Sequence, residues 1–109
     1  MEQAYPPAQA KADNRIVMLM FSTKTCKMCK FMKDVVYEDE AVMEYVENFF
    51  IPIEVDINDH PDKYGYKVFG TPIIYFLRSD SSLIGRMIMG GAKPDGFLLK
   101  LKEVLKQSE

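Results

Sequence analysis

A chain of 109 residues can bury one hydrophobic core and is too short for two independent ones. Its hydrophobic fraction of 48% and charged fraction of 28% are typical of a globular protein, and its net charge of −2 argues against a nucleic-acid-binding surface. The apolar run over residues 16–21 is far shorter than the ~20 residues that cross a bilayer, so we expect no membrane insertion.

The first residues lack the pattern of an export signal, because Met1 is followed by polar and proline-rich sequence rather than by basic and then apolar residues. We expect residues 1–7 to form a flexible arm and residues 8–109 to form a single domain. Pro7 can open a short helix over residues 8–13, since proline is tolerated in a first helical turn. The alanine- and proline-rich start is typical of a mature exported protein, so a periplasmic location is expected in preference to a cytoplasmic one.

The next elements follow the order strand, helix, helix, strand. Residues 16–21 are apolar without alternation, which is typical of a strand buried on both faces. Apolar side chains recur at helical spacing over residues 26–37 and again over residues 39–48, where Asp39 is placed to cap the second helix. Residues 50–56 predict another strand, and a crossover of this kind requires the two strands to be parallel. The expected apolar stripes are Met28, Met32, Val35 and Val36 in the first helix, and Val42, Val46 and Phe49 in the second.

The second half of the chain predicts a hairpin followed by a terminal helix. A polar connection over residues 58–67 leads to two apolar segments, 72–77 and 83–89, and the short polar turn between them requires antiparallel strands. Pro94 then opens a helix whose apolar side chains recur at helical spacing. The order (α)βα(α)β followed by ββα predicts an α/β fold, in which a central mixed sheet carries helices on both faces.

The two cysteines, Cys26 and Cys29, are the whole thiol content of the chain. This number excludes a multi-disulfide scaffold, and with His60 as the only histidine it leaves a tetrahedral zinc site short of ligands. A Cys-x-x-Cys pair joined to a βαβ pattern indicates instead a redox site that needs no metal and no cofactor. Two unrelated packing cysteines are the alternative interpretation, since cysteine is often buried. His60 is expected to lie in a polar loop.

The expected position of Cys26, where a buried strand is followed by a helix, favours a reactive thiol. Unpaired N–H groups at the start of a helix stabilise a thiolate, and residues 24–33 hold four lysines and no acid. Both effects lower the pKa of a thiol. Cys29 lies about one turn further on the same helix face, from where its sulfur can close a disulfide. We therefore expect Cys26 to be the exposed nucleophile and Cys29 the more buried resolving thiol.

Four segments of the sequence resemble the thioredoxin superfamily. They are VMLMFSTKTCKMCKFM, IPIEVDIND, YKVFGTPIIYFL and IGRMIMGG. Over about residues 8–106 the chain looks most like the SoxW-like group of thioredoxin-related proteins, and more loosely like the C-terminal domain of the DsbD electron transporter. The resemblance implies a thioredoxin-like fold, a redox-active disulfide between Cys26 and Cys29, and a cis-proline at Pro72 that lies against this disulfide. It also implies that the backbone of Thr71 pairs with a substrate chain.

The sequence departs from the family at positions that bear on its role. Thr25 replaces the tryptophan that commonly precedes the first cysteine, and Lys27 and Met28 replace the Gly-Pro between the cysteines. Met20 stands where many thioredoxins carry a buried acid, so that proton acceptor is missing. These departures indicate a dedicated redox partner rather than service as a general thioredoxin. We expect Lys27 to help hold the thiolate and Met28 to contact apolar substrate surface.

Together the motif and the resemblance predict an enzyme, a thiol–disulfide oxidoreductase acting on protein substrates as a monomeric reductase in electron transport and cell redox homeostasis. Its electrons are expected from an upstream redox partner, and isomerase or oxidase work stays open. Two alternatives are a non-catalytic thioredoxin-like adaptor with a permanent bridge and a module that binds Cu(I) through the two thiolates. Other side chains are expected to fill the core, among them Met18, Met20, Met32, Met43, Tyr64, Tyr66 and Phe69.

Overall fold

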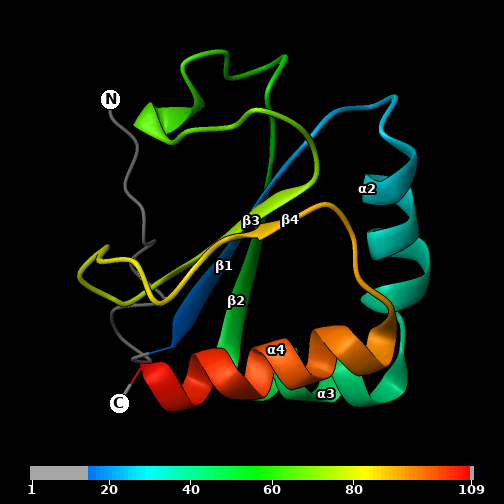
Figure 1. The fold of residues 1–109 in the computed structure, drawn as a ribbon, viewed down its shortest axis with the longest axis vertical. Helices are drawn as coiled ribbons and strands as arrows, with labels where there is room; N and C mark the ends of the chain where they lie inside the picture. The colour runs from blue at the N-terminus through cyan, green and yellow to red at the C-terminus, as the bar shows by residue number, and fades with distance from the viewer. Residues whose placement is uncertain (1–14, 109) are drawn as a thin grey trace.

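The computed structural model describes residues 15–108, so the arm expected over residues 1–7 and the helix expected over 8–13 lie outside the described residues. Figure 1 shows a sheet whose strands run between a vertical helix on one side and two long helices below it. The elements, in chain order, are β1 (Ile16–Ser22), α2 (Lys27–Phe31), a π-helical segment (Met32–Val36), α3 (Glu40–Phe49), β2 (Phe50–Asp56), a 3₁₀ turn (Lys63–Gly65), β3 (Ile73–Leu77), β4 (Ile88–Met89) and α4 (Pro94–Gln107).

The four described strands form one mixed sheet in the order β2-β1-β3-β4. β1 is parallel to β2 and antiparallel to β3, and β3 is antiparallel to β4, as the sequence pattern predicts. Every residue of β1 is buried, which fits its central place in the sheet. Pro52 lies on β2 at the edge of the sheet, where its missing N–H costs no internal ladder bond.

The second strand of the predicted hairpin is much shorter than expected. Only Ile88–Met89 is a strand, and Leu83 forms an isolated bridge with Leu77. Gly85 lies between these two contacts with a φ of +60°, in the left-handed region, so the backbone cannot stay extended there. The expectation of a continuous strand over residues 83–89 is therefore wrong.

The helix expected over residues 26–37 consists of two different parts. Lys27–Phe31 is α-helical, whereas Met32–Val36 is a π-helix that closes with a bond from the Tyr37 N–H to the Met32 carbonyl at 2.8 Å. The wider turn changes which side chains face the core. Met32 and Val36 are buried, but Val35, expected on the same stripe, is exposed.

α3 begins where the sequence predicts. The Asp39 side chain caps the helix by accepting the Val42 N–H at 3.2 Å, and Val42 and Val46 are buried. Phe49 is exposed instead of buried, because it is the last residue of the helix and the following Phe50 takes the core position.

Removing this cap should weaken the fold by a measurable amount. Asp39→Ala leaves the Val42 N–H without its side-chain acceptor and should lower the free energy of unfolding by about 1 kcal/mol. Urea unfolding of the variant and of Glu44→Ala, an exposed change within the same helix, measures the difference. Equal stability of the two variants would contradict the capping role.

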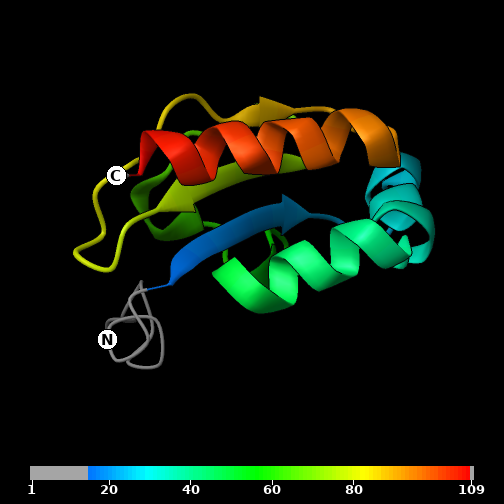
Figure 2. The same ribbon diagram turned by 90° about the horizontal axis from the view of Figure 1, so that it is seen from below.

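The sheet separates two hydrophobic clusters. On one face the π-helical segment, α3 and α4 pack against alternate residues of β1 and β3, and Figure 2 shows α3 and α4 side by side across this face. On the other face the described cover comes from Ile57, Tyr66, Val68 and Met87, without an α-helix. None of the helices within residues 15–108 is long and apolar enough to cross a membrane. The buried residues of the helical face are Ile16, Met18, Met20, Met32, Val36, Val42, Val46, Phe50, Ile74, Phe76, Ile84, Phe97, Leu101 and Val104.

Candidate active site

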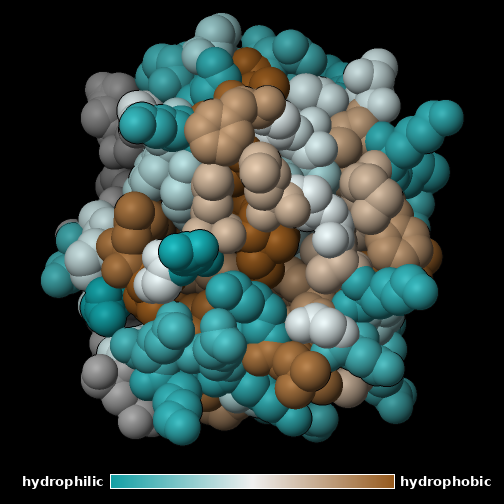
Figure 3. Space-filling view, viewed as in Figure 1, coloured by the Kyte–Doolittle hydropathy of each residue, from teal (hydrophilic) through white to brown (hydrophobic). Residues whose placement is uncertain are grey.

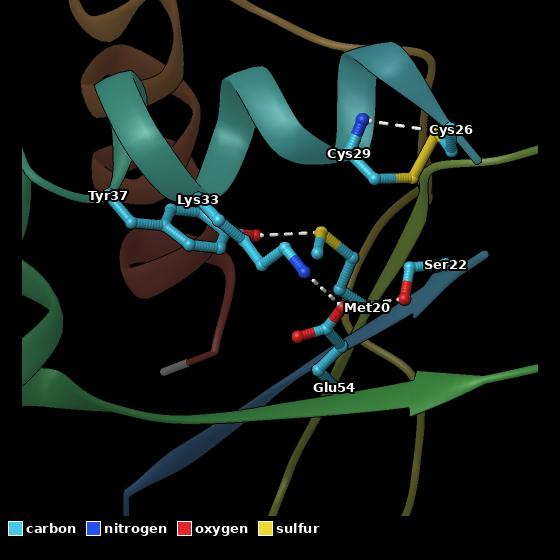
Figure 4. Close-up of a disulfide and its surroundings, with 7 residues drawn as sticks. All are labelled: Met20, Ser22, Cys26, Cys29, Lys33, Tyr37 and Glu54. Atoms are coloured by element: carbon cyan, nitrogen blue, oxygen red, sulfur yellow. Dashed lines mark hydrogen bonds and ion pairs between the residues drawn. A yellow bond between two sulfur atoms is a disulfide. The ribbon is translucent and has the colours of Figure 1, made fainter. Parts of the chain in front are cut away.

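The two cysteines form a disulfide at the point where the chain passes from β1 into α2. Cys26 is the N-cap of α2, and its Sγ accepts the N–H of Cys29 at 3.1 Å (Figure 4). The two Cα atoms lie 5.2 Å apart. Cys26 is partly exposed, whereas Cys29 is only 1% exposed. The pair therefore has one sulfur-bearing residue at the surface and one inside the protein.

Thr71 and Pro72 lie at the same end of the sheet as the disulfide. The register pairs Phe21, near the end of β1, with Ile73 at the start of β3, so Pro72 stands beside the end of the strand that leads to Cys26. The Thr71–Pro72 peptide bond is cis, and the Pro72 carbonyl accepts the Gly90 N–H at 2.9 Å. Pro72 is buried and Thr71 is partly exposed.

Lys27 and Met28, the two residues between the cysteines, both lie at the surface. Met28 is 42% exposed, and the end of its side chain packs against Gly91, where a Cβ would clash with the methionine methyl. Beside it is a hollow of about 320 Å³, lined by Met28, Phe31, Gly91, Ala92 and Lys93. Glycine at position 91 thus makes room for a methionine at the rim of the disulfide region.

Two further apolar side chains are exposed on the segments that flank Pro72. Phe69 is 65% exposed, so its expected core position is wrong, and Met89 on β4 is exposed as well. Met43, also expected in the core, is exposed on α3. Figure 3 shows apolar side chains gathered across the middle of the molecule, above the hydrophilic band over α4. Sequence periodicity gives no signal for Phe69, because it lies in an irregular segment.

A polar cluster, formed by Ser22, Lys33 and Glu54, lies between the helix that carries the disulfide and the sheet. The Ser22 hydroxyl donates to Glu54 Oε2 at 2.6 Å, and the Lys33 ammonium reaches the same oxygen at 3.1 Å (Figure 4). Glu54 pairs with Met20 in the parallel register. This cluster was not predicted from the sequence. The parallel pairing of residues 16–22 with 50–56 is the signal that could have placed Glu54 beside Met20.

Tyr37 borders this cluster and is held in an apolar environment. Its hydroxyl donates to the Met20 thioether at 3.1 Å, and its ring packs 5.7 Å from that of Phe97. Burial raises the pKa of the Tyr37 hydroxyl well above its usual value near 10, and the negative charge of Glu54 raises it further. The charge of Glu54 therefore affects the ionisation of a side chain that is largely buried, that of Tyr37.

This raised pKa predicts that the folded protein becomes less stable at alkaline pH. Above about pH 10 the unfolded chain releases the Tyr37 proton while the folded protein keeps it, so the stability that this group contributes is lost as the pH rises. Between about pH 9 and pH 11, the wild-type protein should lose roughly 1 kcal/mol more stability than Tyr37→Phe. Urea unfolding at the two pH values measures this, and equal losses would contradict the burial of the hydroxyl.

His60 lies in an exposed part of the connection after β2, as expected for a polar loop. Within residues 15–108, no group of three or more His, Cys, Asp or Glu side chains is placed to hold a metal ion.

The comparison with known sequences decides the family of this chain. A family model described as a thioredoxin-like domain matches residues 6–105. The chain belongs to the thioredoxin-like family. Among curated proteins, this thioredoxin-like chain is 22% identical over 99 residues to the thiol:disulfide interchange protein DsbD of Campylobacter jejuni (strain RM1221). The match covers 86% of this chain and 17% of that protein, so the chain spans about a sixth of its relative's length.

Solved structures show the same fold. A thioredoxin from Thermus thermophilus superposes with a TM-score of 0.76 at 27% identity, covering 90% of this chain and 79% of that one. The oxidised C-terminal domain of Neisseria meningitidis DsbD superposes with a TM-score of 0.71 at 25% identity, covering 87% of this chain and 85% of that domain. The thioredoxin-like fold, the mixed sheet and the Cys-x-x-Cys disulfide predicted from the sequence are therefore confirmed.

Proposed function

We propose that this thioredoxin-like protein is a thiol–disulfide oxidoreductase that exchanges disulfides with protein substrates and acts as a reductase. One observation carries the proposal: a disulfide at the start of α2 joins a partly exposed Cys26 to a buried Cys29. A surface sulfur can meet a substrate, while a buried neighbour can attack only the sulfur beside it. This asymmetry suits a two-step exchange.

The exchange conserves atoms and electrons in both steps. In the reduced protein, the Cys26 thiolate attacks a substrate disulfide, which forms a mixed disulfide and releases one substrate sulfur as a thiolate. The Cys29 thiolate then attacks Cys26 Sγ and releases the second substrate sulfur. The substrate gains two electrons, the protein is left with the Cys26–Cys29 disulfide, and a dithiol protein upstream must reduce it again.

The surroundings of Cys26 support its role as the attacking thiol. Its Sγ already accepts a backbone N–H from Cys29, and a thiolate at this position would accept that bond more strongly. Lys27 is the next residue and carries the closest positive charge along the chain. Because Lys27 is exposed, we assign it a modest stabilising effect on the thiolate.

Substrate binding is assigned to the backbone at Thr71, to Pro72 and to the apolar surface around Met28. Thr71 is partly exposed at the sheet end where Cys26 begins the next helix, so an extended substrate chain can lie along it. Met28 lines the hollow beside the disulfide and offers an adaptable apolar contact. The curated relative is named for thiol:disulfide interchange, which is the reaction class proposed for this chain.

An insulin-reduction assay with dithiothreitol as the electron source tests the proposal. We expect the protein to accelerate the precipitation of insulin chains well above the dithiothreitol background, and the same protein alkylated after reduction to show none of this acceleration. No acceleration by the untreated protein would reject the proposal. If its disulfide also resisted mild reductant, the adaptor alternative would be favoured; stoichiometric binding of Cu(I) by the reduced protein would favour the copper-binding alternative.

A further inference from the structure

The buried thiol of Cys29 poses a problem for the second step of the proposed exchange. Cys29 must lose its proton before it attacks Cys26 Sγ, yet Cys29 is only 1% exposed and has little direct access to water. On β1, the residue that pairs with Glu54 is Met20, whose thioether is a weak acceptor and already receives the Tyr37 hydroxyl. Another group must carry the proton between Cys29 and solvent.

Lys33 connects the helix that carries Cys29 to a carboxylate. Lys33 follows Cys29 by four residues, on the π-helical segment that continues α2, and its side chain is exposed. Its ammonium is 3.1 Å from Glu54 Oε2, and Lys33 also lines the hollow of about 280 Å³ that opens on Cys26. Glu54 is thereby held under the helix, on the sheet side of the disulfide, as Figure 4 shows.

Ser22 connects the same carboxylate to the interior. It is the last residue of β1, it is buried, and its hydroxyl donates to Glu54 Oε2 at 2.6 Å. Its oxygen keeps lone pairs that can accept a further hydrogen bond. Ser22 is also the one residue classed as buried and polar within residues 15–108, and its hydroxyl is bonded to Glu54.

Glu54 itself reaches both environments. Its side chain is 40% exposed, so it can exchange a proton with water, while its charge raises the pKa of the buried Tyr37. Oε2 accepts both hydrogen bonds, and within the described part of the chain Oε1 accepts none. The charged and titratable groups around it are Lys33 and Tyr37 from the helical side and Asp56 on its own strand; Lys30 and Asp34 form a separate ion pair.

We infer that Glu54, positioned by Ser22 and Lys33, is the group that accepts the proton of Cys29 during the second step of the exchange. This inference rests on the proposed function. The S–H bond of Cys29 breaks, the proton passes to the Glu54 carboxylate, and the freed electron pair on Cys29 Sγ forms the bond to Cys26 Sγ. The protonated Glu54 then releases its proton to solvent. When the protein is reduced again, the same path returns a proton to Cys29.

Single-turnover kinetics of Glu54→Gln test this assignment. The reduced protein is mixed with an excess of a fluorescence-quenched peptide disulfide between about pH 5 and pH 9, so that formation and resolution of the mixed disulfide appear as two phases. Glutamine keeps an oxygen for the Ser22 hydroxyl but cannot take up the proton. We expect the first phase to be unchanged, and the second to slow by roughly 10²-fold near pH 7, with the difference closing at high pH.

Three variants separate proton transfer from a structural effect. Glu38→Gln, which changes an exposed glutamate outside the Ser22–Lys33–Glu54 cluster, should leave both phases unchanged. Glu54→Asp should restore a large part of the second phase, because it restores the carboxylate. Ser22→Ala, which removes the hydroxyl that positions Glu54, should also slow the second phase. This variant tests the role of Glu54 if Glu54→Gln folds poorly.

These kinetics distinguish failure of the proposed function from failure of the role assigned to Glu54. If the wild-type protein shows neither phase, the proposed function is wrong. If the wild-type protein shows both and Glu54→Gln and Ser22→Ala keep its second phase and pH profile, the function stands and the role of Glu54 is wrong. Slowing of both phases by the same factor at every pH would likewise overturn it, because that is the result of a general structural disturbance.

Discussion

Cys29→Ser is expected to trap substrates as stable mixed disulfides on Cys26, whereas Cys26→Ser should trap none. The first variant keeps the partly exposed sulfur that meets the substrate and loses the buried sulfur that would release it. The second variant keeps only Cys29, a residue that is 1% exposed and so out of a substrate's reach. Both variants should lose the whole of the insulin-reducing activity above background, so the covalent adduct is what distinguishes them.

Non-reducing electrophoresis and intact-protein mass spectrometry measure this difference. Each reduced variant is incubated with a disulfide-bonded peptide, and the added mass of one peptide chain is sought. An adduct on Cys26→Ser in place of Cys29→Ser would reverse the assignment of the two cysteines. The absence of an adduct on either variant would count against protein disulfides as substrates.

Phe97→Ala is expected to cause the largest loss of stability among simple truncations of α4, about 3–5 kcal/mol. The Phe97 side chain is fully buried between the sheet and the helices, and its ring packs on Tyr37. Removing it leaves a cavity in a core layer that the π-helical segment, α3 and α4 share.

Leu99→Ala is the matched control, because Leu99 lies two residues further along the same helix and is 68% exposed. It should change the free energy of unfolding by less than about 0.5 kcal/mol. Urea unfolding of the two variants gives both values. A similar loss of unfolding free energy in both variants would contradict the expectation that the buried face of α4 contributes most of its stability.

The elements predicted well from the sequence are those whose signals agree with one another. Residues 16–21 are apolar throughout and become the central strand, and Asp39 precedes a periodic segment and caps it. The Cys-x-x-Cys spacing also places both sulfurs at the start of a helix, where they are bonded. In each case a local preference and the packing of the whole domain favour the same conformation.

The features that the sequence did not predict depend on contacts between distant segments. The π-helical segment has the same apolar spacing as an α-helix, so the sequence gives no signal for its wider turn; in the structure its Met32 and Val36 belong to the core shared with α4 and the sheet. The short β4 depends on Gly85, which could belong to a strand or to a turn. Glu54 looks like an ordinary exposed residue of a strand, and its hydrogen bonds to Ser22 and Lys33 arise from residues 32 and 21 positions away. The assignment to the SoxW-like group stays a prediction.

The proline on the outermost strand has a consequence for how copies of this protein meet in solution. β2 forms one margin of the sheet, and its exposed residues include Pro52, which offers no N–H, and Glu54, which brings a carboxylate. A strand arriving from another molecule would find an interrupted row of donors and a charge to desolvate. This margin is thereby protected against edge-to-edge aggregation, which matters for the proposed exchange because that reaction needs the disulfide end to be accessible to other chains.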